Sequence, residues 1–232
     1  MDEEYARLAA TYDERWASYI AASIGLTLSR LPPEHRFERI LDVGCGTGAL
    51  LARLSARFPS ATLLGADPSL AMLTAARSRA IGRAALVAAR AEALPFPDAC
   101  FDLLVSTSAM HYFADLDAAA AELYRVIAPG GALSITDWCR DFLTMRALDR
   151  VMRMRGKANF TMLRSGDCER LLRSVGFEEI VIERRRIGVL WGLMVVSARK
   201  PAALDERARR RGALRGARRS QALPYPNRCP GP

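Results

Sequence analysis

Three glycines within five residues constrain this chain more than any other feature of its sequence. Gly44, Gly46 and Gly48 follow the short apolar segment 39–43, and a segment with helical periodicity begins at Ala49. Glycine lets the backbone turn tightly and approach a ligand closely, and the N-terminus of the next helix presents free N–H groups. We therefore expect a strand, a ligand-binding turn and a helix, in that order.

Short apolar segments alternate with helical segments along most of the chain. This alternation is typical of a Rossmann-like α/β fold, a doubly wound, mainly parallel seven-stranded sheet with helices on both faces. The predicted strands are residues 39–43, 62–66, 85–88, 102–106, 132–136, 179–182 and 193–196. The predicted helices are residues 1–29, 49–57, 68–80, 116–127 and 167–175, with Pro68 in the first turn of its helix.

Composition favours one domain with an extension. The chain has 232 residues and no run of the roughly 20 apolar residues that a membrane helix needs. We predict a domain over residues 1–200, with residues 1–29 as an N-terminal cap helix and residues 138–164 as a lid-like insertion. Residues 201–232 are Arg- and Pro-rich and are predicted to be a disordered tail. This tail carries +6 of the formal net charge of +9, so the domain itself is close to ordinary in charge.

Cellular location and metal content also have sequence signals. The acidic N-terminus, residues 1–4, lacks the basic and apolar parts of a signal peptide, which predicts a cytoplasmic protein. The five cysteines form no CxxC pair, and the two histidines are far apart in sequence. We therefore expect no metal site.

Two acids discriminate between ligands for the glycine turn. Asp67 ends the second predicted strand, about 20 residues on, where a carboxylate can bind a ribose of either a nicotinamide cofactor or another adenosine ligand. Asp42 lies at the end of an otherwise apolar strand, directly before the turn. An anion there opposes a pyrophosphate and favours an ammonium or sulfonium group. S-adenosylmethionine combines such a cation with adenosine, and an NAD-dependent oxidoreductase is the alternative.

Four segments in order carry a family resemblance: residues 40–48 (ILDVGCGTG), 65–73 (GADPSLAML), 91–102 (AEALPFPDACFD) and 125–131 (RVIAPGG). Together they resemble the motifs of class I S-adenosylmethionine-dependent methyltransferases. The resemblance is to the small-molecule subgroup that includes ubiquinone and menaquinone biosynthesis enzymes. Residues 12–16 also resemble the N-terminal helix that closes over the cofactor in this subgroup.

The resemblance implies roles for individual residues. Asp42 would face the amino group of the cofactor, Asp67 would hold the ribose hydroxyls, and Met72 would pack on the adenine. Tyr12 would face the sulfonium through cation–π attraction, and Ser106 would line the cleft. The implied cofactor-binding residues are Asp42, Gly44, Cys45, Gly46, Gly48, Asp67, Pro68, Met72, Ala91, Glu92, Ser106 and Tyr12.

One position departs from the family pattern. Arg90 stands where many relatives have an acid that bonds the adenine amine. Either Glu92 and the backbone bind the adenine edge without that acid, or the affinity for the cofactor is lower.

The implied reaction moves a methyl group to a small organic acceptor, at a carbon, nitrogen or oxygen atom. Candidate proton acceptors are His111, after the fourth predicted strand, and Asp137, at the end of the fifth. We expect both to line the acceptor space with Tyr112 and the 138–164 insertion. No Asn/Asp-Pro-Pro-aromatic motif is present, so methylation of a nucleic-acid base is not expected. The remaining alternative is a non-catalytic cofactor-binding protein that contacts nucleic acid through the basic tail.

Overall fold

The computed structural model describes residues 12–31, 37–79, 81, 84–155 and 160–202. The predictions for residues 1–11 and for the tail beyond residue 202 lie outside these ranges. No helix among the described residues is long and apolar enough to cross a membrane.

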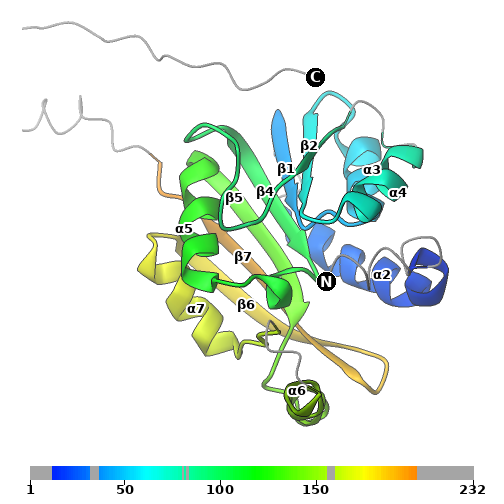
Figure 1. Ribbon diagram of the computed structural model, residues 1–232. Coiled ribbons are helices and arrows are strands. Elements are labelled where there is room, and N and C mark those ends of the chain that lie inside the picture. Colours follow the sequence, from blue (N-terminus) through cyan, green and yellow to red (C-terminus); the bar gives the residue numbers. More distant parts are fainter. Residues whose placement is uncertain (1–11, 32–36, 80, 82–83, 156–159, 203–232) are drawn as a thin grey trace, which may run out of the picture.

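A seven-stranded sheet forms the centre of the molecule (Figure 1). The strands lie in the order β3-β2-β1-β4-β5-β7-β6, and all are parallel except β7, which is antiparallel to both of its neighbours. The strands are β1 (Arg39–Val43), β2 (Thr62–Asp67), β3 (Ala85–Ala88), β4 (Phe101–Thr107), β5 (Ile127–Trp138), β6 (Glu178–Ile187) and β7 (Trp191–Arg199). This topology confirms the predicted Rossmann-like, mainly parallel fold.

Helices cover both faces of the sheet, as predicted (Figure 1). The helices are α2 (Tyr12–Ser29), α3 (Ala49–Arg57), α4 (Leu70–Ser78), α5 (Leu116–Val126), α6 (Leu143–Met154) and α7 (Ser165–Ser174), with a short 3-10 helix η1 (Met110–Tyr112). One buried apolar cluster includes Leu54 of α3 and Leu73 of α4. A second cluster, on the other face, includes Leu123 of α5 and Leu172 of α7. Apolar side chains thus project from both faces of the sheet and pack against one apolar stripe of each helix.

Two local predictions need correction. Helix α4 begins at Leu70 rather than in the turn containing Pro68, because the Ser69 hydroxyl caps it by accepting from the Met72 N–H at 3.4 Å. The segment 128–131, which lies between the predicted helix 116–127 and the predicted strand 132–136, belongs to β5, which begins directly after α5. Gly130 adopts a φ of 80° there, and its N–H donates to the Lys200 carbonyl at 2.9 Å. This bond holds the start of β5 beside the residue that follows β7.

The order of the strands determines where a ligand can bind. The chain leaves β1 toward β2 on one side, whereas β4 pairs with β1 on the other side. At such a switch point, the loops that follow the two strands diverge and leave a crevice at the carboxyl edge of the sheet. Three predicted site segments follow β1, β2 and β4 and therefore meet at this edge.

Candidate active site

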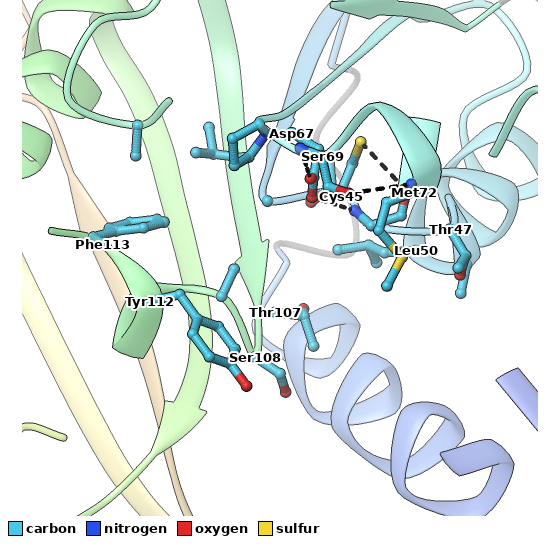
Figure 2. Close-up of a pocket in the computed structure, with 18 of the residues that line it drawn as sticks. Cys45, Thr47, Leu50, Asp67, Ser69, Met72, Thr107, Ser108, Tyr112 and Phe113 are labelled. Atoms are coloured by element: carbon cyan, nitrogen blue, oxygen red, sulfur yellow. Dashed lines mark hydrogen bonds between the residues drawn. The ribbon is translucent and has the colours of Figure 1, made fainter. Parts of the chain in front are cut away.

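A pocket opens at the carboxyl ends of β1, β2 and β4. Its walls come from the turn after β1, the segments after β2, β3 and β4, and the helix α2. In Figure 2, Cys45, Asp67 and Met72 lie on one side of the pocket, and Ser108 and Tyr112 lie across from them. Ten of the implied cofactor-binding residues line it: Asp42, Gly44, Cys45, Gly46, Asp67, Pro68, Met72, Ala91, Glu92 and Tyr12.

Close packing shapes the backbone of the glycine turn. Gly44 has a φ of 74°, and a Cβ at this position would lie 2.2 Å from the Cβ of Ala109. The N–H groups of Gly44 and Cys45 both donate to the Ala66 carbonyl, at 2.7 and 3.1 Å. The turn is thus fixed to the end of β2, and only glycine fits at position 44.

Asp42 is a buried acid with one oxygen that lacks a partner. The residue lines the pocket and is 1% exposed, and its Oδ2 has no hydrogen-bond partner among the described residues. Burial, with the nearby Asp67 carboxylate, raises the pKa of Asp42 to about 8. A cation at this position would provide the missing partner and favour the ionised form.

Asp67 holds together the two turns beside it. Its Oδ2 accepts from the Gly46 N–H at 2.9 Å, and its Oδ1 accepts from the Ser69 N–H at 2.8 Å. A carboxylate offers about four acceptor positions, so these two backbone bonds leave the side chain able to accept from ribose hydroxyls as well.

Two of the implied residues support the pocket from behind its wall. Gly48 has a φ of 76° at the start of α3, and a Cβ there would lie 3.2 Å from the Cβ of Ala76 in α4. Ser106 is fully buried, and its hydroxyl donates to the Val43 carbonyl at 2.7 Å, tying β4 to β1. Neither residue lines the pocket.

Glu92 provides a partner for the unexpected Arg90. The Arg90 Nε lies 3.4 Å from Glu92 Oε2, and Glu92 Oε1 accepts from the N–H groups of Ala114 and Asp115 at 2.6 and 3.3 Å. Burial opposes ionisation of Glu92, but the backbone donors and Arg90 outweigh it and lower the pKa of Glu92. Both side chains line the pocket, and Glu92 also fixes the segment that leads into α5.

Hydroxyl groups line the side of the pocket across from the glycine turn. The Trp138 Nε1 donates to the Tyr19 hydroxyl at 2.7 Å, and that hydroxyl lies 2.8 Å from the Ser108 Oγ. Burial raises the pKa of Tyr19, and it raises the pKa of Tyr12 to about 12, so both phenols are neutral near pH 7. Ser108 has a φ of 56°, a left-handed backbone that is unfavourable for serine. Strain of this kind is frequent at functional sites.

The two candidate proton acceptors form a buried pair outside the pocket. His111 Nδ1 lies 2.5 Å from Asp137 Oδ1, and the side chains are 2% and 1% exposed. The His111 ring stacks on Trp138 at a centroid distance of 4.3 Å and packs against Tyr112 at 4.1 Å. Of the residues expected around the acceptor, Tyr112 lines the pocket, whereas His111, Asp137 and the described part of the 138–164 insertion do not.

Contacts that the sequence analysis missed hold α2 against the glycine turn. The Thr47 hydroxyl donates to Asp13 Oδ1 at 2.7 Å. Arg79 pairs with Asp13, and its Nε donates to the Thr47 carbonyl at 2.9 Å. Asp13 and Thr47 both lie within motif segments, but no spacing rule pairs residues that are this far apart in sequence.

S-adenosylmethionine fits the residues present. The unpartnered oxygen of Asp42 suits an ammonium group, the Asp67 carboxylate suits a ribose, and Met72 offers an apolar surface in the same pocket. A pyrophosphate would instead lie beside the Asp67 carboxylate and would oppose ionisation of Asp42, so a dinucleotide fits poorly.

Comparisons with known proteins found similarity to methyltransferases. Residues 41–135 match the family model described as a methyltransferase domain. The chain is 40% identical over 129 residues to the demethylmenaquinone methyltransferase of Thermus thermophilus, covering 54% of this chain and 55% of that protein. It is 50% identical over 96 residues to the malonyl-[acyl-carrier protein] O-methyltransferase of Geobacter sulfurreducens, covering 40% and 36%. The chain thus spans about half or less of the length of these relatives.

Solved structures share the fold. A SAM-dependent methyltransferase from Thermotoga maritima superposes with a TM-score of 0.70 at 20% identity, covering 86% of this chain and 99% of that chain. The [4+2]-cyclase SpnF superposes with a TM-score of 0.62 at 21% identity, covering 78% and 81%. Likeness at this level of identity shows the fold alone.

The topology places the chain in the Rossmann-like class of α/β folds, with a pocket at the carboxyl edge of the sheet. Within the chain, residues 41–135 are similar to the family model of a methyltransferase domain. This match confirms the resemblance to the class I S-adenosylmethionine-dependent methyltransferases that the sequence motifs indicated.

Proposed function

We propose that the protein transfers the methyl group of S-adenosylmethionine to a small organic acceptor, at a carbon, nitrogen or oxygen atom. One observation carries the proposal: Asp42 is a buried acid beside the glycine turn, with one oxygen unpartnered. Such a group favours a cationic nucleoside over a dinucleotide. The methyltransferase-domain match over residues 41–135 supports the same conclusion.

The residues of the pocket divide the ligand between them. Asp42 binds the ammonium group, and Asp67 accepts from the ribose hydroxyls. Met72, Ala91 and Glu92 border the adenine, where Arg90 takes the place of the acid found in many relatives. These assignments use the pocket positions of the side chains together with the family resemblance.

Catalysis here depends on orientation rather than on a covalent intermediate with the protein. S-adenosylmethionine, when bound, supplies a methyl group already activated by its positive sulfur. The acceptor atom forms its bond to the methyl carbon as the carbon–sulfur bond breaks, and its proton leaves to water or to a base. Tyr12 and Tyr112 help to exclude water from the pocket, and holding the reactants in line accounts for much of the acceleration. The His111–Asp137 pair acts as a positioning pair, because it packs against Tyr112 behind the pocket wall.

Ligand binding tests the proposal directly. Melting of the chain is followed with S-adenosylhomocysteine and, separately, with NADH. We expect a rise in melting temperature with S-adenosylhomocysteine that grows with its concentration. Stabilisation by NADH and not by S-adenosylhomocysteine would instead favour an oxidoreductase.

Methyl transfer needs its own measurement. The chain is incubated with methyl-tritiated S-adenosylmethionine and a low-mass metabolite extract, and labelled products are separated by chromatography. We expect a labelled small molecule that forms at least about tenfold more slowly with the Asp42→Asn variant when S-adenosylmethionine is subsaturating. Binding without any transfer would point to a non-catalytic cofactor-binding protein.

A further inference from the structure

Exposed apolar side chains gather at one end of the molecule. Five of the seven exposed large apolar residues among those described lie on α6 or on the turn between β6 and β7. We call these five the apolar tip: Leu143, Val151, Met154, Val189 and Leu190. Val189 is 86% exposed, Leu143 is 73% exposed, and Met154 is 71% exposed. Exposure of this extent at neighbouring positions marks an interaction surface.

The two parts of the apolar tip project from the same edge of the sheet. Helix α6 follows the carboxyl end of β5, and the turn follows the carboxyl end of β6, which runs parallel to β5 (Figure 1). Phe142, just before α6, packs so closely on Gly192 of β7 that a Cβ there would lie 2.2 Å from the ring. The Arg186 guanidinium lies 5.0 Å from the centre of the same ring. Helix and hairpin are therefore packed together.

Arginines surround the apolar tip. The exposed ones on α6, on its C-cap and at the end of β6 are Arg146, Arg150, Arg153, Arg155, Arg184, Arg185 and Arg186. Nearby acids neutralise only part of this charge, because Asp149 of α6 is shared between Arg140 and Arg153, and Glu183 is shared between Arg30 and Arg185. Among the described residues, no acid forms an ion pair with Arg146 or Arg150. This end of the molecule therefore combines apolar surface with uncompensated positive charge.

We propose that this end docks on the anionic lipid surface of a membrane, with the apolar tip entering the headgroup region. The shape favours lipid over a protein groove. Ile187 pairs with Trp191, so Val189 and Leu190 belong to a three-residue turn that projects from the hairpin. A projecting apolar turn can enter the headgroup layer while arginines contact lipid phosphates. The half-buried Trp191 at the base of the turn suits headgroup depth.

The docking surface adjoins the side of the pocket that lies across from the glycine turn. The ring of Trp191 lies 5.2 Å from that of Tyr19, which lines the pocket, and 5.1 Å from that of Trp138. Docking would therefore bring a lipid surface next to this wall. The proposal does not rest on methyl transfer, because vesicle binding is measured without an acceptor.

Vesicle sedimentation tests the proposal. The full chain is mixed with vesicles of phosphatidylcholine alone or with added phosphatidylglycerol, at low and at physiological salt. We expect binding that requires phosphatidylglycerol and weakens with salt. Val189→Ser with Leu190→Ser should lower the partition coefficient at least about tenfold, since two side chains lose apolar burial. Each of Arg146→Gln and Arg150→Gln should lower it about fivefold.

A matched control uses the other two exposed apolar residues. Leu70→Ser with Val181→Ser removes similar apolar surface from α4 and from the opposite end of β6, and should leave vesicle binding unchanged. Thermal melting shows that each variant is folded. Unchanged binding after the Val189 and Leu190 substitutions would overturn the proposal, because charge alone, the basic tail included, would then hold the chain. Failure of the native chain to sediment with anionic vesicles would overturn it too, leaving an acidic protein as the partner for these arginines.

Discussion

Replacing Asp42 by asparagine should stabilise the free protein and weaken its complex. Burial, with the nearby Asp67 carboxylate, raises the pKa of Asp42 from 3.8 to about 8, so the carboxyl group is protonated in most free molecules at pH 7. Between pH 3.8 and pH 7, folding therefore takes up a proton that the unfolded chain releases. At 1.36 kcal/mol for each pH unit, the penalty at pH 7 reaches about 4 kcal/mol as an upper limit.

The expected gain in stability is smaller than this limit. Asparagine removes the pH-dependent penalty but leaves a buried amide without its full set of partners, which costs about 1–3 kcal/mol. We expect a net gain of about 1–3 kcal/mol at pH 7, or several degrees in melting temperature. The native pKa is raised, so stability of the native chain falls as pH rises. Near pH 4, where the penalty is nearly absent, the variant should be less stable than the native chain by the cost of its amide, and its relative stability should rise with pH until about pH 8.

Ligand binding should favour the native chain over the Asp42→Asn variant, opposite to the effect of the substitution on the stability of the free protein. When a cation binds beside Asp42, the acid ionises, so the native chain should release a proton at pH 7 on binding S-adenosylhomocysteine. Titration calorimetry in buffers of different ionisation enthalpy measures this release. Asp42→Asn should release no proton and bind at least about tenfold more weakly, since a hydrogen bond to a charged group is lost.

Asp102→Asn provides the matched control. Asp102 accepts from the N–H groups of Glu38 and Arg39 at 2.7 and 3.1 Å, and it does not line the pocket. This variant should melt at a lower temperature than the native chain, with proton release unchanged. Equal stability of Asp42→Asn and the native chain from pH 4 to pH 8, with proton release preserved in the variant, would refute the reasoning.

Three further predictions address the walls of the site. Asp13→Ala should weaken S-adenosylhomocysteine binding about three- to tenfold, because α2 loses its contacts with Thr47 and Arg79. The exposed ion pair itself contributes less than about 1 kcal/mol to stability, and unchanged affinity in calorimetry would contradict a role in binding. Ser108→Gly should be more stable than Ser108→Ala by about 1 kcal/mol in thermal melting. Both variants lack the hydroxyl, but only glycine adopts a φ of 56° without backbone strain. Equal stability would show that the backbone is unstrained. His111→Gln should destabilise the fold by about 3 kcal/mol, since it disrupts a buried pair. The variant should keep an affinity for S-adenosylhomocysteine within about threefold of native. A large loss of turnover in a folded variant, with affinity intact, would show that His111 is a catalytic base.

Much of the fold could be predicted because local sequence determines it. Strands β1 to β4 are short, mainly apolar runs, and the predicted strand 39–43 and helix 49–57 match β1 and α3. The start of α4 could not be predicted as easily, because Pro68 and Ser69 are both acceptable at a helix start. Only the hydrogen bond from the Met72 N–H to the Ser69 hydroxyl identifies Ser69 as the N-cap. The entry into β5 escaped prediction because Gly130 is fixed there by Lys200, 70 residues away in the chain.

The candidate site shows the same division. Residues in the turns after β1 and β2 were found because glycines and acids in a short motif meet at one sheet edge. The pairing of His111 with Asp137 could not be found, since it depends on how the segment after β4 packs beside β5. The family resemblance implied that Ser106, at the end of the fourth predicted strand, lines the cleft. Its hydroxyl points to the Val43 carbonyl, and strand direction alone does not reveal that choice.

Asp42 and Asp67 illustrate what the structure adds to such motifs. In the sequence they look alike, as acids that end neighbouring parallel strands. In the structure, Asp67 accepts from two backbone N–H groups, whereas one oxygen of Asp42 lacks a donor among the described residues. The acid without a donor is the one whose ionised form is unfavourable in the free protein, and a cationic ligand relieves that penalty while a neutral or anionic one does not. Selectivity for a cation therefore arises because this oxygen of Asp42 has no hydrogen-bond donor among the described residues. The selectivity should disappear if a substitution placed a donor next to that oxygen.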